Sequence, residues 1–164
     1  MKVIRAAIKA AHKPTFRVCE LNVLGNHAHL LTEALDAQAL ARGMQGLEVR
    51  LARRLNSALK RRGTLFAQRY HARILTTPRE VRNCRRYVRL NRKHHAAEKK
   101  FARAWIDPCS SAAWFAGWAE PIRVNTGWKH ALVTMEPPVA RAETWLLAVG
   151  WRRHGPLAFD ERPA

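Results

Sequence analysis

The sequence lacks any apolar run of the roughly 18 residues that a membrane span requires, so it predicts no transmembrane helix. Its start, Met1 to Arg5, is too short and too polar for a secretory signal peptide. The three cysteines, at positions 19, 84 and 109, are odd in number and far apart, which argues against a disulfide framework and a CxxC zinc site. We therefore expect a cytoplasmic protein whose cysteines serve as small apolar residues.

Acidic residues are scarce, since 12 Asp and Glu stand against 30 Lys and Arg, for a formal net charge of +18. Residues 42–103 carry +16 of that charge, residues 1–41 carry +2, and residues 104–164 are neutral. Such a field attracts phosphate chains, and its excess of arginine favours forked contacts to phosphate or guanine. We expect nucleic acid as the partner. An acidic membrane surface and a merely solvated basic face are the alternatives.

Tryptophan is absent before position 105, and all six tryptophans share the last third of the chain with six of the eight prolines. This change of composition coincides with the change of charge. We therefore predict a domain over residues 1–103 and a Trp-rich, charge-neutral, loop-rich C-terminal extension over residues 104–164. The extension is expected to pack on the domain or to cover one of its faces.

Helical and strand periodicities over residues 1–95 predict an α+β fold. The expected elements, in order, are a helix over 1–12, strands over 16–23 and 27–35 joined at Gly25-Asn26, a helix from Asp36 to near Gly63, a strand over 70–76, and a helix from Pro78 to about His94. This order matches a ferredoxin-like antiparallel sheet with helices on one face, lacking its first strand. The other face of such a sheet stays free for a site.

The clearest boundary signal in the chain precedes the last predicted helix. Thr77 can serve as its N-cap, and Pro78 can occupy the first helical position. Glu80, three residues after Thr77, completes a capping box.

His27 and His29 form the most informative pair of side chains. Residues i and i+2 of a strand point to the same side, so both imidazoles leave one sheet face and can share one divalent metal ion. The alternative is two half-exposed histidines beside a turn, which is the more frequent case for an isolated pair.

Tyr87 and Asn91 lie four residues apart on the last predicted helix and therefore share one of its faces. The Asn91 carbonyl is a suitable ligand for a hard divalent ion. A tyrosine hydroxyl, a poor nucleophile at its usual pKa of about 10, reacts more readily with a metal-polarised phosphate. If the helix crosses the open sheet face, Tyr87 and Asn91 meet His27 and His29, and the four would cleave a phosphodiester through a phosphotyrosine. A packed tyrosine beside a solvated amide is the alternative.

Three segments carry a family resemblance over roughly residues 1–95. They are GNHAHLL at 25–31, LFAQRYHAR at 65–73 and RYVRLN at 86–91. In this order they resemble the IS200-type Y1 transposases, most closely their REP-associated tyrosine transposase branch. The resemblance implies an HUH nuclease in which His27 and His29 match the motif histidines, Tyr87 the nucleophile and Asn91 the third metal ligand.

The resemblance further implies a single-strand DNA endonuclease and strand transferase that acts beside hairpins. The family keeps a 5′-phosphotyrosine link, leaves a free 3′-hydroxyl, and uses Mg²⁺ or Mn²⁺ without a nucleotide cofactor. We accordingly expect a nucleoid-associated monomer or homodimer, without membrane contact, that takes part in DNA transposition or REP-element processing. A non-catalytic nucleic-acid-binding remnant of such a transposase is the alternative.

Two departures from the family pattern affect these expectations. The family has a strand before the first helix, and the absence of that strand here predicts a bare sheet edge, from a mis-assigned start or a decayed copy. Many relatives also have Asn-Pro where this chain has Asn91-Arg92, so the helix can continue and place Asn91 differently.

Candidate contacts to the DNA backbone are the arginines around the third motif and the segment before it. They are Arg69, Arg73, Arg82, Arg85, Arg86, Arg89 and Arg92. Tyr70 is a rival nucleophile, but it lacks an amide one turn further on, and we interpret it as structural.

Overall fold

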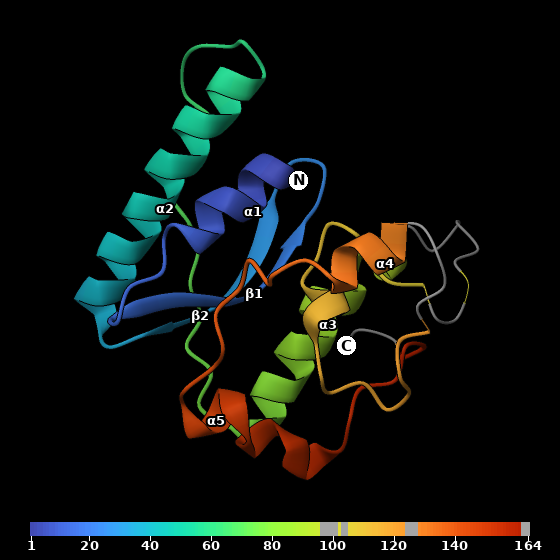
Figure 1. Ribbon diagram of the computed structural model, residues 1–164. Helices are drawn as coiled ribbons and strands as arrows, with labels where there is room; N and C mark the ends of the chain where they lie inside the picture. Colours follow the sequence, from blue (N-terminus) through green and yellow to red (C-terminus); the bar gives the residue numbers. More distant parts are fainter. Residues whose placement is uncertain (96–101, 103–104, 124–127, 162–164) are drawn as a thin grey trace.

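The computed structural model describes residues 1–95, 102, 105–123 and 128–161, with backbone alone for residues 93–95 (Figure 1). Its elements are α1 (Lys2–Lys9), β1 (Phe16–Val23), β2 (Ala28–Ala34), α2 (Ala37–Ala58), α3 (Pro78–His95), the 3-10 helix η1 (Ala112–Trp114), α4 (Trp128–Val133), α5 (Trp145–Ala148) and the 3-10 helix η2 (Gly150–His154). None of the described helices is long and apolar enough to span a bilayer. The predicted domain boundary at 103/104 falls outside the described residues.

β1 and β2 form a two-stranded antiparallel sheet, and the α+β class is confirmed. Asn22 lies opposite His29, and Val23 lies opposite Ala28. The register shifts between Val18 and Glu20, which makes a bulge in β1. The predicted strands match the observed ones to within one residue, because alternation and the turn residues are local signals.

The helices divide between the two faces of the sheet, unlike the expectation that they share one (Figure 1). One face is covered by α1 and α2, through a cluster made by Ile8, Ala11, Phe16, Val18, Leu21, Met44 and Leu47. The other face is crossed by α3, and its cluster contains Cys19, Leu31, Val81, Leu147, Trp151 and Leu157. β1 is thus covered on both faces, which explains why most of its residues are buried.

The third strand expected over residues 70–76 is wrong. This segment lies outside the sheet, with Ile74 82% exposed. Tyr70 packs against the cluster of α1 and α2, and Leu75 against that of α3. A strand needs a neighbour about 4.8 Å away to pair with, and no described segment forms a ladder with residues 70–76. Apolar alternation could predict the burial of these two side chains but not a pairing partner.

The C-terminal extension lies along the outer edge of β1. Ser111 N donates to Leu21 O at 2.8 Å, and Val23 N donates to Cys109 O at 2.9 Å. Further along, Ala140 N donates to Val18 O at 2.8 Å. These bonds satisfy backbone groups that an edge strand would otherwise expose to pairing with another chain.

α2 packs tightly against β1 at Gly43, where a Cβ would overlap the ring of buried Phe16. We expect Gly43→Ala to lower the free energy of unfolding by about 1–3 kcal/mol, as overpacked cores do. Urea denaturation measures this. The matched control is Gly46→Ala on the same helix, whose Cβ meets only the end of the flexible Arg50 side chain, at 2.9 Å. The control should be neutral or stabilising by up to about 1 kcal/mol; equal losses in both variants would contradict the steric explanation.

Candidate functional site

The start of α3 is fixed by the predicted capping box, which is confirmed. Thr77 Oγ1 accepts a hydrogen bond from Glu80 N at 3.2 Å, and Glu80 Oε2 accepts one from Thr77 N at 3.1 Å. Four hydrogen bonds lower the pKa of Glu80 to about 2. In order of effect, their donors are the Thr76 N–H, the Arg73 guanidinium, the Thr76 hydroxyl and the Thr77 N–H. The carboxylate is therefore charged at neutral pH, next to the positive end of the helix dipole.

The two histidines lie side by side at the turn between the strands. The His27 and His29 ring centroids are 4.9 Å apart. His27 is exposed, and its Nδ1 lies 2.7 Å from Asn26 Oδ1. His29 is half-buried on β2, opposite Asn22. The structure thus brings together the two imidazoles that the sequence paired.

α3 brings Tyr87 to the same place. The Tyr87 and His29 rings meet edge to face, with centroids 5.0 Å apart and an interplanar angle of 76°. Asn91 follows one helical turn later, on the same face of α3. The helix therefore crosses the sheet face that carries the histidines, as the convergence of these four residues requires.

Asn91 is fully buried, and neither its Oδ1 nor its Nδ2 has a hydrogen-bond partner among the described residues. A buried polar group left unpaired costs about 1–3 kcal/mol, so its retention calls for an explanation. A ligand for the amide oxygen is one explanation.

The donor chemistry of His27, His29 and Asn91 fits a divalent ion. Imidazole nitrogens bind many divalent metals, and carbonyl oxygens suit hard ions such as Mg²⁺ and Mn²⁺. Within the described part of the chain, no three His, Cys, Asp or Glu side chains gather in an arrangement that could hold a metal. A metal held here would therefore depend on the Asn91 amide in addition to the two imidazoles.

Most of the arginines predicted to contact DNA are bound to carboxylates. Glu20 lies 2.8 Å from Arg85 and 2.5 Å from Arg89, and all three side chains are buried. The Arg89 guanidinium also lies 3.4 Å from the Phe115 ring centroid, and that of Arg85 lies 4.6 Å from the Trp151 ring. To reach DNA, Arg85 and Arg89 would have to leave the interior.

The remaining predicted arginines lie nearer the surface. Arg82 binds Glu161 at 2.8 Å, Arg86 lies 3.7 Å from the same carboxylate, and Arg73 binds Glu80 at 2.7 Å. Arg92 binds Asp107. Arg69 is exposed and takes part in none of the ion pairs found among the described residues.

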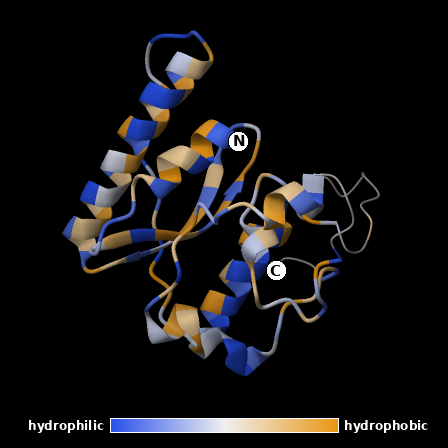
Figure 2. Cartoon of the chain, viewed as in Figure 1, coloured by the Kyte–Doolittle hydropathy of each residue, from blue (hydrophilic) through white to orange (hydrophobic). Residues whose placement is uncertain are grey.

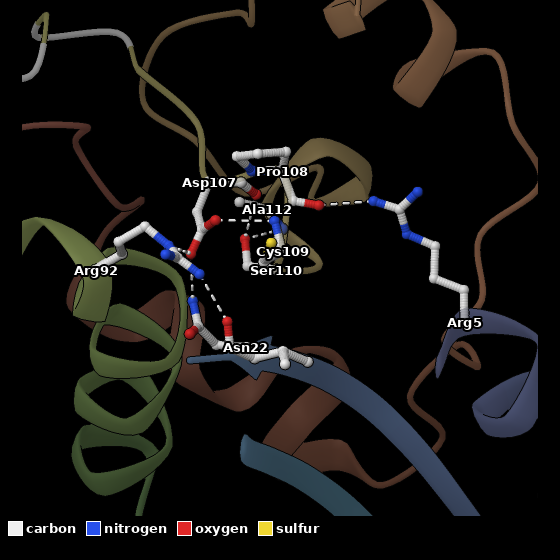
Figure 3. A network of polar contacts seen from close by, with 9 residues as sticks. Arg5, Asn22, Arg92, Asp107, Pro108, Cys109, Ser110 and Ala112 are labelled. Carbon is white, nitrogen blue, oxygen red and sulfur yellow. Dashed lines mark hydrogen bonds and ion pairs between the residues drawn. The ribbon is translucent and has the colours of Figure 1, made fainter. Parts of the chain in front are cut away.

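The end of α3 next to Asn91 is held by contacts that the sequence did not reveal (Figure 3). Arg92 Nε lies 2.9 Å from Asp107 Oδ2, and Arg92 Nη2 donates to Val23 O at 2.8 Å. Asn22 Nδ2 donates to the same Asp107 oxygen at 3.0 Å. The hydrogen bond to Asp107 raises the pKa of Arg92. A polar residue in an apolar strand was a weak signal for Asn22, and nothing local marked Asp107.

A second feature missed from the sequence is a groove on α2, with a volume of about 400 Å³. It is lined by Arg42, Gln45, Gly46, Val49, Arg50 and Arg53. No cation of α2 takes part in an ion pair with another described residue. Hydrophilic and hydrophobic residues follow one another along the end of α2 that extends beyond the sheet (Figure 2). The described cations of the basic stretch that lie outside these ion pairs are shared between α2, the segment after it and the start of α3. They are Arg42, Arg50, Arg53, Arg54, Lys60, Arg61, Arg62, Arg69 and Arg79.

His29 of β2 and His27, just before that strand, thus lie beside Tyr87 of α3, on the helix face that also carries Asn91. A family model described as "Transposase IS200 like" matches residues 2–91, more than half of the chain, and the chain belongs to this family. Membership places it among the transposases, a class of DNA-binding enzymes that cut and join DNA. No curated protein and no solved structure matches the chain.

Proposed function

We propose that this transposase is a metal-dependent endonuclease and strand transferase for single-stranded DNA, of the REP-associated branch, which works through a 5′-phosphotyrosine at Tyr87. The observation that carries the proposal is the placement of Tyr87. Its ring lies edge-on to His29, beside His27, on the helix face that also holds the unpaired Asn91 amide.

In the proposed cleavage step, Tyr87 Oη attacks the phosphorus of the scissile phosphodiester. A bond forms from Oη to phosphorus, the bond from phosphorus to O3′ breaks, the hydroxyl proton of tyrosine is released, and the departing O3′ takes up a proton. A divalent ion held by His27, His29 and Asn91 would polarise the phosphate and stabilise its developing charge. Strand transfer is the reverse step, in which a 3′-hydroxyl attacks the phosphotyrosine and frees Tyr87.

For the DNA we propose a path along cations that have no carboxylate partner among the described residues. The α2 groove offers Arg42, Arg50 and Arg53 around Gly46, whose carbonyl accepts a hydrogen bond from Arg50 Nη1 at 2.9 Å. Exposed Arg69 extends this set. Guanidinium contacts to phosphates do not read sequence, so affinity along this path should fall steeply with salt.

The proposal is tested by a covalent-adduct assay on hairpin-flanked single-stranded DNA, resolved on a denaturing gel. With Mn²⁺ we expect a protein–DNA adduct that EDTA abolishes. His27→Ala should reduce it by about 100-fold, because it removes a proposed metal ligand. His71→Ala, at an exposed histidine outside the site, is the matched control and should behave as wild type.

An adduct that persists in EDTA, or in His27→Ala at the wild-type level, would contradict the proposed metal site. Salt-sensitive DNA binding by the wild type without an adduct under any metal would instead favour the non-catalytic remnant.

A further inference from the structure

The last turns of α3 are anchored by a residue that lies beyond the family match. That match ends at Asn91, and Arg92 is the next residue in the chain. Arg92 makes two contacts in different directions, one to Asp107 of the extension and one to Val23 O of β1. A side chain held at two points fixes the rotation of its helix better than one contact can.

The anchoring point on β1 is close to the histidines. Val23 pairs with Ala28, which lies between His27 and His29 in the chain. Arg92, the residue after Asn91, therefore connects α3 to the hairpin that carries both imidazoles.

Asp107 is built as a rigid acceptor (Figure 3). The residue is 1% exposed. Oδ2 accepts from Arg92 and from Asn22, and Oδ1 accepts from Cys109 N at 2.8 Å. Ser110 closes the turn by donating from its N and its Oγ to Asp107 O. The carboxylate thus has little freedom to follow Arg92 if α3 turns.

A small rotation of α3 has a large effect on a ligand. Side-chain atoms lie about 5–6 Å from the axis of an α-helix, so a rotation of about 10° moves them by about 1 Å. Metal–ligand distances in working sites stay within about 0.2 Å of their ideal values. The rotation of α3 at Asn91 must therefore be held to a few degrees.

We infer that Asp107 is a positioning residue, which through Arg92 sets the place of Asn91 relative to His27 and His29. The C-terminal extension thereby completes the metal site. This inference rests on the proposed function, since it concerns the same metal.

The matched control is Glu161, another carboxylate of the extension that binds an arginine of α3. It binds Arg82 at 2.8 Å and lies 3.7 Å from Arg86, nine and five residues before Asn91 along the helix. A purely structural role of the extension would make Asp107→Asn and Glu161→Gln alike. If Asp107 positions Asn91, the two variants should differ in their affinity for the metal ion and lose similar amounts of stability.

The experiment is a Mn²⁺ titration of the full chain without DNA, followed by electron paramagnetic resonance, with thermal unfolding recorded for each variant. We expect Asp107→Asn to weaken Mn²⁺ binding about 10-fold, as the loss of outer contacts to metal ligands does. Glu161→Gln should change it less than 2-fold, while both variants lower the melting temperature. Mn²⁺ binding by Asp107→Asn at the wild-type level would overturn the inference.

If Asp107→Asn does not fold, Arg92→Lys replaces it, because lysine keeps the charge but loses the two-point contact. It should weaken Mn²⁺ binding several-fold, and wild-type binding would again overturn the inference. The inference alone fails if the wild type binds Mn²⁺ and the variants bind it equally well. The proposed metal site fails with it if the wild type binds no Mn²⁺.

Discussion

Replacing Tyr87 with Phe should abolish the covalent protein–DNA adduct, a loss of at least about 1000-fold, while DNA affinity stays within about 2-fold of wild type. The substitution removes only the hydroxyl that would attack phosphorus. The ring that contacts His29 remains, so the fold and the histidine pair should be preserved. The adduct is measured on a denaturing gel, and binding by fluorescence anisotropy.

The chain supplies its own control for this experiment, because it contains two tyrosines. Tyr70 packs against the cluster of α1 and α2. Tyr70→Phe should therefore retain the adduct. An adduct that survives in Tyr87→Phe, or disappears in Tyr70→Phe with DNA binding intact, would mean that the nucleophile is misassigned.

The largest expected effect on stability is that of Glu20→Ala, a loss of about 3–5 kcal/mol in the free energy of unfolding. Glu20 is buried between Arg85 and Arg89, and its removal leaves two guanidinium groups inside the protein without a carboxylate. Burial lowers the pKa of Arg89 to about 10, which still leaves it charged at neutral pH. Stacking on Phe115 and Trp151 offsets only part of this cost.

Urea denaturation at pH 7 measures the loss. The matched control is Glu136→Ala, which removes an exposed carboxylate paired with Lys9. Exposed pairs contribute about 0–1 kcal/mol, so the control should remain close to wild type. Losses of similar size in the two variants would mean that the buried cluster is not a main determinant of stability.

Local signals in the sequence were sufficient for most of the secondary structure. Turn residues at 25–26 gave the hairpin, and Thr77, Pro78 and Glu80 gave the start of α3. Each of these features depends on residues within a few positions of one another. The strand expected over residues 70–76 failed because pairing depends on a partner elsewhere in the chain, which alternation does not reveal.

In the candidate site, too, local spacing predicted some features, and contacts between distant residues could not be predicted. Spacing of two and four residues was enough to predict that the histidine pair and the Tyr87–Asn91 pair each share a face, and the structure brings the two pairs together. The contacts of Asp107 join residues up to 85 positions apart, so no local pattern could indicate them. The arginines of α3 looked like a basic surface because Glu20, which binds Arg85 and Arg89, lies 65 and 69 positions earlier in an apolar strand.

The contacts between the extension and α3 also determine which part of this protein can be transplanted. A fragment that ends with the family match would carry the histidines, Tyr87 and Asn91. It would leave Arg85 and Arg89 without their aromatic rings and would lack both Arg92 and Asp107. The outer edge of β1 would lose the backbone bonds from Cys109 and Ser111. A graft or chimera that is to keep these contacts therefore needs residues 1–91 together with the extension that follows them.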